Sequence, residues 1–457
     1  MLRRRKLSLE EGYSSLGNCA FLMLPWTISR HHSWVGLGAC LFAVVLHPNS
    51  SLAALPAETA MASAPIDLNA ALSLAEDANI DVIRARLSVK AAQANLRSAD
   101  TAPNPVFSVN AIQIRPSQIG SLAYGQLVDT TARVDLPLER GGKRTARVRA
   151  ATAIIRAAED DLASARRDMR EAVYDAYYDL KAAENRIAIL QAVAQSYADS
   201  LSLAEKQERA GALSNGDLAR QNVEAARART DAIQSVTQWH AAQLALATLI
   251  GRETQSMTLA TTGDWPVSAA TGDQAADLMA MHRPDVLAAQ ARTEAARRNL
   301  DGAHALRHPD VTVGMQYEHA RGDVGVGDSV GVGVSVPLPV RNRYNGEVDA
   351  AGTALVQAEA EERKAISVAT ADIMIARQSL REAGEHRRQF DDIQLPAARK
   401  AAEVAEFAYK HGATSLIELL DARRSLRAVE LGAIDARSDE ATAIARLHAA
   451  ETIEGDR

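Results

Sequence analysis

The sequence is poor in the residues that fill a compact globular core. Only 4% of its 457 residues are aromatic, and alanine dominates the apolar fraction. Such a composition suits helices that pack closely along their length better than it suits a globular interior. Proline and glycine are also sparse, and neither occurs from Lys143 to Glu208. That gap predicts a single helix roughly 100 Å long.

Other absences exclude whole classes of protein. No apolar run of 18 residues occurs in the body of the chain, which excludes a bundle of membrane helices. The net charge of −6 is small and charges of both signs are interspersed, so the sequence indicates no nucleic-acid partner. It contains no nucleophile–base pair, phosphate loop or zinc-protease motif. We therefore expect no enzyme, no catalytic residue and no cofactor.

Two short patterns imitate functional motifs. His304 and His308 have a spacing that can bind a metal on a helix, but no third acidic or thiolate ligand lies close in sequence. We expect no metal site there. The glycines of residues 322–333 alternate within a strand pattern and no helix starts there, so they do not predict a phosphate loop.

The N-terminus carries an export signal. An apolar stretch from Val35 to Leu46 is followed at residues 51–53 by small side chains, with the spacing that a signal peptidase accepts. We therefore expect residues 1–53 to be a leader and the mature chain to begin near Ala54. This leader is unusually long, and Met23 offers a later start of translation.

Both cysteines, Cys19 and Cys40, precede the expected cleavage site. The mature chain would then contain no thiol and no disulfide. Residues 37–40 resemble a lipoprotein cleavage box, but the apolar run continues beyond Cys40. This continuation favours a chain without a lipid anchor.

The rest of the chain contains the same pattern twice, about 200 residues apart. Three kinds of landmark recur in the same order. A strand region begins at 102–106 in the first half and at 307–311 in the second, and it ends at 134–144 and 334–346, respectively. A helical stretch is interrupted at 209–212 in the first half and at 410–413 in the second. A duplication accounts for all three. Each half is expected to consist of a helix, a strand pair, a very long helix and a further helix.

The strand regions alternate with period two, which places different side chains on the two faces of a sheet. The expected apolar face carries Phe107, Val109, Ala111, Ala132, Val134, Leu136, Val311, Val313, Met315, Tyr317, Val330, Val332, Val334 and Val336. The opposite face carries Thr131, Arg133, Asp135, Thr312, Gly314, Gln316, Glu318, Ser329, Gly331, Gly333 and Ser335.

Each strand is about nine or ten residues long, which is enough to cross a bilayer when tilted. Four such strands cannot close a membrane barrel, because the smallest barrels have about eight. An oligomer would have to supply the others. Two soluble hairpins with one wet face are the alternative interpretation of the same alternation.

Helical periodicity fills the remainder of each half. From Met169 to Ala204 apolar residues recur at alternating three- and four-residue steps, which is the period of a coiled coil. Shorter helices at 67–102 and 214–249 would match the long helix when stacked end to end, and 346–410 would be the long helix of the second half. A plain coiled-coil scaffold has the same periodicity, but it leaves the strand pairs unexplained.

These patterns divide the chain into nine segments. They are a leader (1–53), an N-terminal segment with the first helix (54–104), a first hairpin (105–138), the long and return helices of the first repeat (142–249), an inter-repeat segment (250–274), the first helix of the second repeat (275–307), a second hairpin (309–338), its long and return helices (346–450) and a tail (451–457).

The duplicated order resembles the TolC-type outer-membrane factors of Gram-negative bacteria. Within them, residues 137–144 and 336–343 look most similar to the cobalt–zinc–cadmium type of heavy-metal efflux channel. The resemblance implies a mainly α fold with a β-barrel portion. Three identical chains would form a 12-stranded barrel in the lipid of the outer membrane and a periplasmic α-helical tunnel. A periplasmic membrane-fusion adaptor and an inner-membrane pump, of the resistance-nodulation-division type, would be its partners.

The resemblance also assigns a gate at the periplasmic hairpin tips. Glu418 and Asp421 match acidic rings that face the pore, while Asp217 and Tyr409 match partners in a closing bond network. Glu418 and Asp421 are three residues apart and share a helix face, and three copies around a narrow axis would hold cations. Solvated surface acids are the alternative explanation. Thr414 replaces a basic residue usual in this network, which weakens the expected lock.

Two further sets of residues follow from the resemblance. The adaptor contacts would be Gly211, Ala212, Leu213 and Ser214 in one turn, and Gly412, Ala413, Thr414 and Ser415 in the other. The barrel lumen would be lined by Arg133, Asp135, Gln316 and Glu318, while Val332 and Val334 would face lipid.

The function implied is a passive exit duct for an efflux pump, with heavy-metal cations as the expected substrate. A multidrug or type I secretion channel of the same fold is one alternative. A periplasmic coiled-coil structural or adaptor protein without a barrel is another. An adaptor would place a lipoyl-like β-sandwich between the arms of one helical hairpin, whereas this chain has two sets of hairpins.

Overall fold

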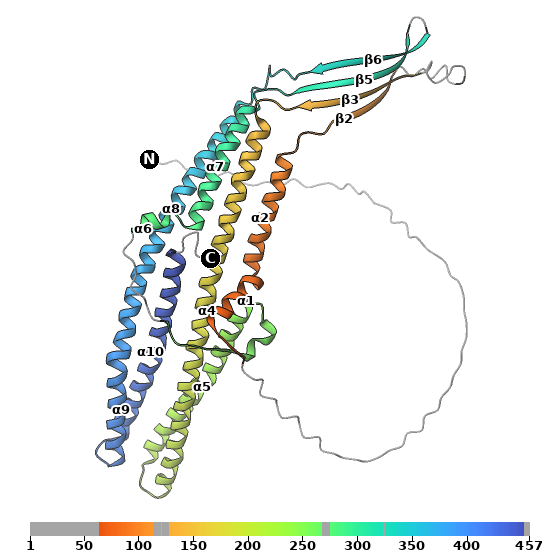
Figure 1. Cartoon of the computed structure of the whole chain (residues 1–457). Coiled ribbons are helices and arrows are strands. Elements are labelled where there is room, and N and C mark those ends of the chain that lie inside the picture. The colour runs from red at the N-terminus through yellow and green to blue at the C-terminus, as the bar shows by residue number, and fades with distance from the viewer. Residues whose placement is uncertain (1–63, 113–119, 121–127, 267–274, 323–324, 452–457) are drawn as a thin grey trace, which may run out of the picture. The chain divides into compact units, whose positions relative to one another are not determined.

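Long helices and a four-stranded sheet make up most of the described part of the chain (Figure 1). The computed structural model describes residues 64–112, 120, 128–266, 275–322 and 325–451. The expected leader, with Cys19 and Cys40, lies outside these residues. All described elements belong to one compact unit, Met61–Arg457. No helix among them is both long and apolar enough to cross a membrane.

The first half runs from a short strand to a helical hairpin. Its elements are β1 (Ala64–Ile66), α1 (Leu68–Ala78), α2 (Ile80–Ala99), β2 (Val106–Ile112), β3 (Asp129–Leu138), α4 (Lys143–Arg209) and α5 (Asn215–Leu249). Helix α4 spans 67 residues without interruption. It occupies the stretch in which the sequence lacks proline and glycine.

The second half repeats this order after a short connection. The connection contains the 3₁₀ turn η2 (Glu253–Thr258) and β4 (Leu259–Thr261). Then follow α6 (Ala276–Ala280), α7 (Pro284–Ala305), β5 (Val311–Gly322), β6 (Gly325–Ser335), α8 (Asn345–Arg388), η3 (Gln389–Gln394), α9 (Leu395–Lys410) and α10 (Leu416–Glu451).

The first helix of each half is broken, so the single helices expected at 67–102 and 275–307 are wrong. Asn79 separates α1 from α2, and its side-chain oxygen accepts hydrogen bonds from the backbone N–H groups of Asp81 (2.9 Å) and Val82 (3.2 Å). These bonds satisfy N–H groups that have no partner inside the helix. In the second half Pro284 begins α7, a position where its missing N–H costs nothing.

The long helix expected at 346–410 is interrupted by the π-helical turn η3. Pro396 follows this turn and cannot donate a backbone hydrogen bond, which favours a local change of helix type. Two contacts with α10 fix the turn. Arg437 donates a 2.7 Å hydrogen bond to Asp391, and the Phe390 ring lies so close to Gly432 that a Cβ atom there would be 2.5 Å from it.

The four long strands form one antiparallel sheet in the order β2-β3-β5-β6. In the register of the sheet, apolar residues pair with apolar residues of the neighbouring strand, for example Val134 with Met315, and Met315 with Val332. Gly314 pairs with both Asp135 and Gly333. The two faces predicted from the alternation are therefore confirmed.

The apolar core lies where the inter-repeat segment meets the helices. Strands β1 and β4 pair in parallel, a two-stranded sheet that the periodicity did not predict. Ile66 of β1 and Leu259 of β4 belong to a buried cluster that also includes Tyr177, Leu180, Leu246 and Ile250. The Tyr177 hydroxyl accepts a 3.1 Å hydrogen bond from the backbone N–H of Thr262. This bond attaches the inter-repeat segment to the middle of α4.

Helix α4 is the central packing element of the unit, because it contacts α2, α5, α7 and α10. Its buried positions include many alanines, which allow neighbouring helices to approach closely. The sheet extends from the ends of α2, α4, α7 and α8, and the α4–α5 and α9–α10 turns lie at the opposite end of the helices (Figure 1). Any function of the turns is thus separated from the sheet by the length of α4.

Candidate functional site

The two turns at the helical end share one conformation. Gly211 and Gly412 both have positive φ, 74° and 72°, which glycine adopts without steric cost. The residue after each glycine donates a 2.8 Å hydrogen bond back to the preceding helix, from Ala212 to Gln207 and from Ala413 to Ala408. These bonds satisfy carbonyl groups at the helix ends. The sequence duplication therefore extends to the detailed geometry of the turns.

A serine caps the helix that follows each turn. Ser214 Oγ accepts a 3.1 Å bond from the Asp217 N–H and donates a 2.8 Å bond to the Asp217 carboxylate. Ser415 Oγ accepts a 3.3 Å bond from the Glu418 N–H. Arg220 also donates to Asp217, at 3.1 Å. Within one chain, Asp217 is thus engaged in capping its own helix.

The two predicted gate acids lie exposed on the first turns of α10. The Asp421 side chain is 61% exposed and accepts a 2.9 Å hydrogen bond from Arg424. Arg424 in turn donates to both carboxylate oxygens of Glu224 on α5, at 2.7 and 3.2 Å. The charge of Asp421 is therefore partly compensated within its own chain. Glu418 is the carboxylate of the two that is more available to bind a cation.

Glu224 is a site residue that the sequence interpretation missed. Its side chain is only 6% exposed, and the hydrogen bonds from Arg424 hold the pKa of this carboxyl below its usual range. The pair joins α5 to α10 beside a groove of about 440 Å³ that Asp421 also lines. The spacing of Asp421 and Arg424 suggests their mutual contact, but nothing local in sequence indicates Glu224.

Tyr409 lies at the end of α9 and packs against an apolar cluster near the turns. The buried members of this cluster are Tyr197, Ala228, Leu416 and Leu420. They come from α4, α5 and α10, so the cluster holds the two helical hairpins together. The cluster gives Tyr409 an apolar contact inside one chain, while its predicted part in a network with Asp217 stays a prediction.

At the opposite end of the helices, the sheet exposes its apolar face. Val332 is 74% exposed, and Phe107, Met315, Val330 and Val334 are also exposed. A contiguous apolar surface of this kind on a single chain marks contact with a membrane or another protein. The described polar face carries Arg133, Asp135, Gln316 and Glu318, the residues assigned to the lumen.

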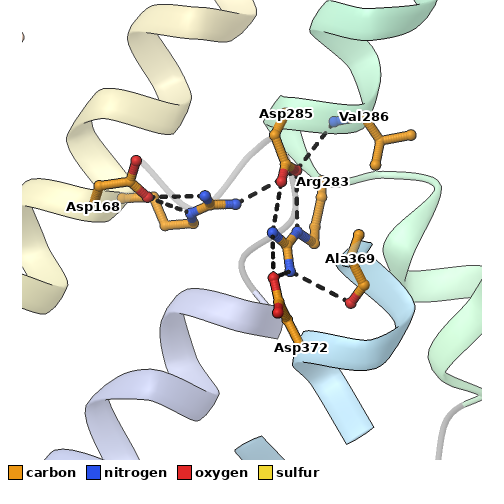
Figure 2. Close-up of polar contacts among 7 residues, drawn as sticks. Asp168, Arg283, Asp285, Val286, Ala369 and Asp372 are labelled. Atoms are coloured by element: carbon orange, nitrogen blue, oxygen red, sulfur yellow. Dashed lines mark hydrogen bonds and ion pairs between the residues drawn. The ribbon is translucent and has the colours of Figure 1, made fainter. Parts of the chain in front are cut away.

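An ionic cluster around the buried Arg283 lies where α7 begins, and the sequence interpretation missed it. Figure 2 shows Arg283 between two carboxylates: it donates to Asp285 at 2.6 and 3.0 Å and to Asp372 at 3.4 Å. Its side chain is 4% exposed. Arg167 of α4 approaches Asp285 from the other side at 3.5 Å. The cluster ties α4, α7 and α8 together, which is a structural role.

The structure also removes the geometric basis for a metal at His304 and His308. Helix α7 ends at Ala305, so the two imidazoles do not share a helix face. Within the described ranges, no group of three or more His, Cys, Asp or Glu side chains is arranged to hold a metal ion.

Comparison with protein families identifies the family of this chain. The model for the outer membrane efflux protein family matches residues 71–252 and 276–451, which correspond to the two halves. The chain belongs to the outer membrane efflux protein family. Members of this family are outer-membrane channels of efflux systems and not enzymes. The predicted family, the outer-membrane location and the absence of enzymatic function are therefore confirmed.

Two named relatives match most of the chain. The cobalt-zinc-cadmium resistance protein CzcC of Cupriavidus metallidurans is 26% identical over 421 residues, 89% of this chain and 97% of the relative. The pyoverdine export outer membrane protein OpmQ of Pseudomonas putida is 28% identical over 387 residues, 79% of this chain and 80% of the relative.

Solved structures show that the fold is shared. The outer membrane protein VceC of Vibrio cholerae has a TM-score of 0.70 at 20% identity, covering 84% of this chain and 95% of its own. A membrane protein from Pseudomonas aeruginosa has a TM-score of 0.73 at 21% identity, covering 84% and 90%. CusC has a TM-score of 0.68 at 19% identity, covering 85% and 92%. These likenesses confirm the TolC-type, mainly helical fold.

Proposed function

We propose that three copies of this chain form the outer-membrane exit duct of a tripartite efflux system. The observation that carries the proposal is the exposed apolar face on a sheet of only four described strands. An isolated sheet of this kind leaves apolar side chains in water and polar backbone groups at its edges. A closed barrel in lipid satisfies both.

Three copies give twelve strands, which exceeds the smallest closed membrane barrels. In such a barrel Val332 and its neighbours contact lipid, and the opposite face, with Arg133 and Glu318, lines an aqueous lumen. The alternation of the two faces along each strand supports this arrangement. The helices of the three chains then continue the duct into the periplasm.

The partners follow from the ends of the duct. The turns at Gly211 to Ser214 and Gly412 to Ser415 are exposed or half-buried, so a periplasmic membrane-fusion adaptor can contact them. An inner-membrane pump, of the resistance-nodulation-division type, supplies the energy, and the duct conducts passively. Glu418, Asp421, Asp217 and Tyr409 form the gate at this end.

We propose heavy-metal cations as the substrate. The support is the CzcC relative, whose name refers to cobalt, zinc and cadmium and of which this chain covers 97%. Exposed carboxylates at a narrow entrance, above all Glu418, would raise the local concentration of cations. The observation against this substrate is that OpmQ, named for pyoverdine export, is about as similar. An exporter of organic metal chelators is therefore the second candidate.

A deletion strain separates the two substrates. Loss of the gene should lower the concentrations of cobalt, zinc and cadmium that inhibit growth, and the wild-type gene should restore them. An unchanged metal tolerance together with intracellular retention of a chelator would support the second candidate. Fractionation of the same cells tests the alternative without a barrel, since a periplasmic scaffold would not appear in the outer membrane as a heat-sensitive trimer.

A further inference from the structure

The Arg133 side chain contacts its neighbours on the polar face of the sheet. Its Nε atom donates hydrogen bonds of 2.8 Å to both carboxylate oxygens of Asp135, and Nη1 reaches Gln316 Oε1 at 3.5 Å. Asp135 belongs to the same strand, whereas Gln316 belongs to β5. Hydrogen bonds within β3 and across to β5 thus hold the guanidinium group in place.

One glycine, Gly314, provides the space for this arrangement. Gly314 lies between Asp135 and Gly333 in one row across β3, β5 and β6. A Cβ atom on Gly314 would be 2.3 Å from Asp135 Oδ1 and 2.8 Å from Arg133 Nη2, distances at which atoms overlap. A Cβ on Gly333 would be 3.9 Å from Arg133 Nη2. Gly314 is therefore needed for the ion pair, and the guanidinium nitrogens of Arg133 extend over β5 as far as Gly333 of β6.

The consequence is that the charges of Arg133 and Asp135 cancel locally on this face of the sheet. The side chains of Arg133 and Asp135 are 32% and 24% exposed, so both still face the open space above the sheet. Glu318 stands on the same face, between Thr131 and Ser329. Without Arg133, Asp135 would add a second carboxylate to this face.

We propose that Arg133 determines the ion selectivity of the barrel lumen by cancelling the charge of Asp135. This inference rests on the proposed function, because only a closed trimer makes the face a lumen. A conducting pore must bind ions weakly enough to release them. Three compensated pairs let cations that entered past Glu418 leave the barrel without being held by a ring of Asp135 carboxylates.

The test is the reversal potential of purified channels in planar bilayers under a potassium chloride gradient. Arg133→Gln removes the positive charge that compensates Asp135, which leaves three uncompensated Asp135 carboxylates in one trimer. It should raise the potassium-to-chloride permeability ratio by about two-fold or more at low salt, and by less at high salt because of screening. Asp135→Asn should shift the ratio toward chloride. The double variant should return it to the wild-type value.

The matched control is Arg84→Gln, which removes the same charge from the exposed surface of α2. It should leave the reversal potential unchanged. The proposal is overturned if assembled Arg133→Gln and Asp135→Asn trimers both keep the wild-type ratio, or if the double variant fails to restore it. If Arg133→Gln does not assemble, Asp135→Asn alone decides, and an unchanged ratio overturns the proposal. A wild-type protein that forms no channel would instead contradict the proposed function.

Discussion

Placing a charge on the apolar face of the sheet tests the orientation of the proposed barrel. Val332 is the eighth of the eleven residues of β6, is 74% exposed and pairs with Met315 on the same face. If this face contacts lipid, Val332→Arg puts a guanidinium into hydrocarbon. The same substitution at Ser335, three residues further along the strand, points it toward the lumen.

The magnitude follows from the depth of the residue. Arginine on the lipid face costs about 2–4 kcal/mol near the bilayer midplane and about 0–1 kcal/mol near the interfaces. A trimer carries three copies, so Val332→Arg should destabilise the inserted assembly by roughly 6–12 kcal/mol in total. Ser335→Arg should cost little, because a lumenal side chain remains in water.

The assay is the amount of heat-sensitive trimer in the outer-membrane fraction, together with urea titration of protein folded into lipid vesicles. We expect severe loss of Val332→Arg trimer and near-normal Ser335→Arg trimer. Equal depletion by both substitutions would show that the assigned facing is wrong. A greater loss of trimer with Ser335→Arg than with Val332→Arg would mean that the lipid-facing and lumen-facing sides of the sheet are the reverse of those assigned.

Three further predictions concern the helical part. Because Asp421 is paired with Arg424, Glu418→Ala should reduce the cation selectivity of the channel, and its block by divalent cations, more than Asp421→Ala does, while the yield of trimer stays unchanged. If both variants keep the wild-type selectivity and block, these two residues do not belong to the gate. Arg283→Met removes the hydrogen bonds to Asp285, whose side chain is 30% exposed and still has Arg167 at 3.5 Å, so it should lower the free energy of unfolding by about 1–3 kcal/mol. A transition at the wild-type urea concentration would contradict this. Burial raises the pKa of the Asp175 carboxyl, so ionisation of this group favours the unfolded chain. Asp175→Asn should therefore raise the melting temperature at neutral pH but not at about pH 3, where the carboxyl is protonated in both the folded and the unfolded state. A higher melting temperature of the variant at both pH values would refute this cause.

The elements that the sequence predicts well are those specified by local pattern. The absence of breakers from Lys143 to Glu208 predicts α4, and the alternation around Val332 predicts both faces of the sheet. Each of these signals is repeated over many neighbouring residues. The glycines at 211 and 412 likewise mark turns, because a positive φ has a local steric cost for other residues.

The features that the sequence did not predict depend on single residues or on distant contacts. Asn79 interrupts a helical pattern by capping the next helix, which apolar periodicity does not register. Arg424 and Glu224 are 200 residues apart, and their pairing depends on which helices are neighbours. The same holds for Arg283 and Asp372 on α8. Such contacts require the packed arrangement, whereas the pair of Asp421 and Arg424 follows from a three-residue spacing on one helix.

The central claim is that three chains close one barrel around an aqueous duct. Cryo-electron microscopy of the detergent-purified protein tests it most directly. The account predicts a three-fold symmetric particle in which four strands from each chain form a closed ring, with Val332 facing the detergent belt and Arg133 facing the lumen. A monomeric particle, or an assembly in which Val332 is buried against protein, would contradict it.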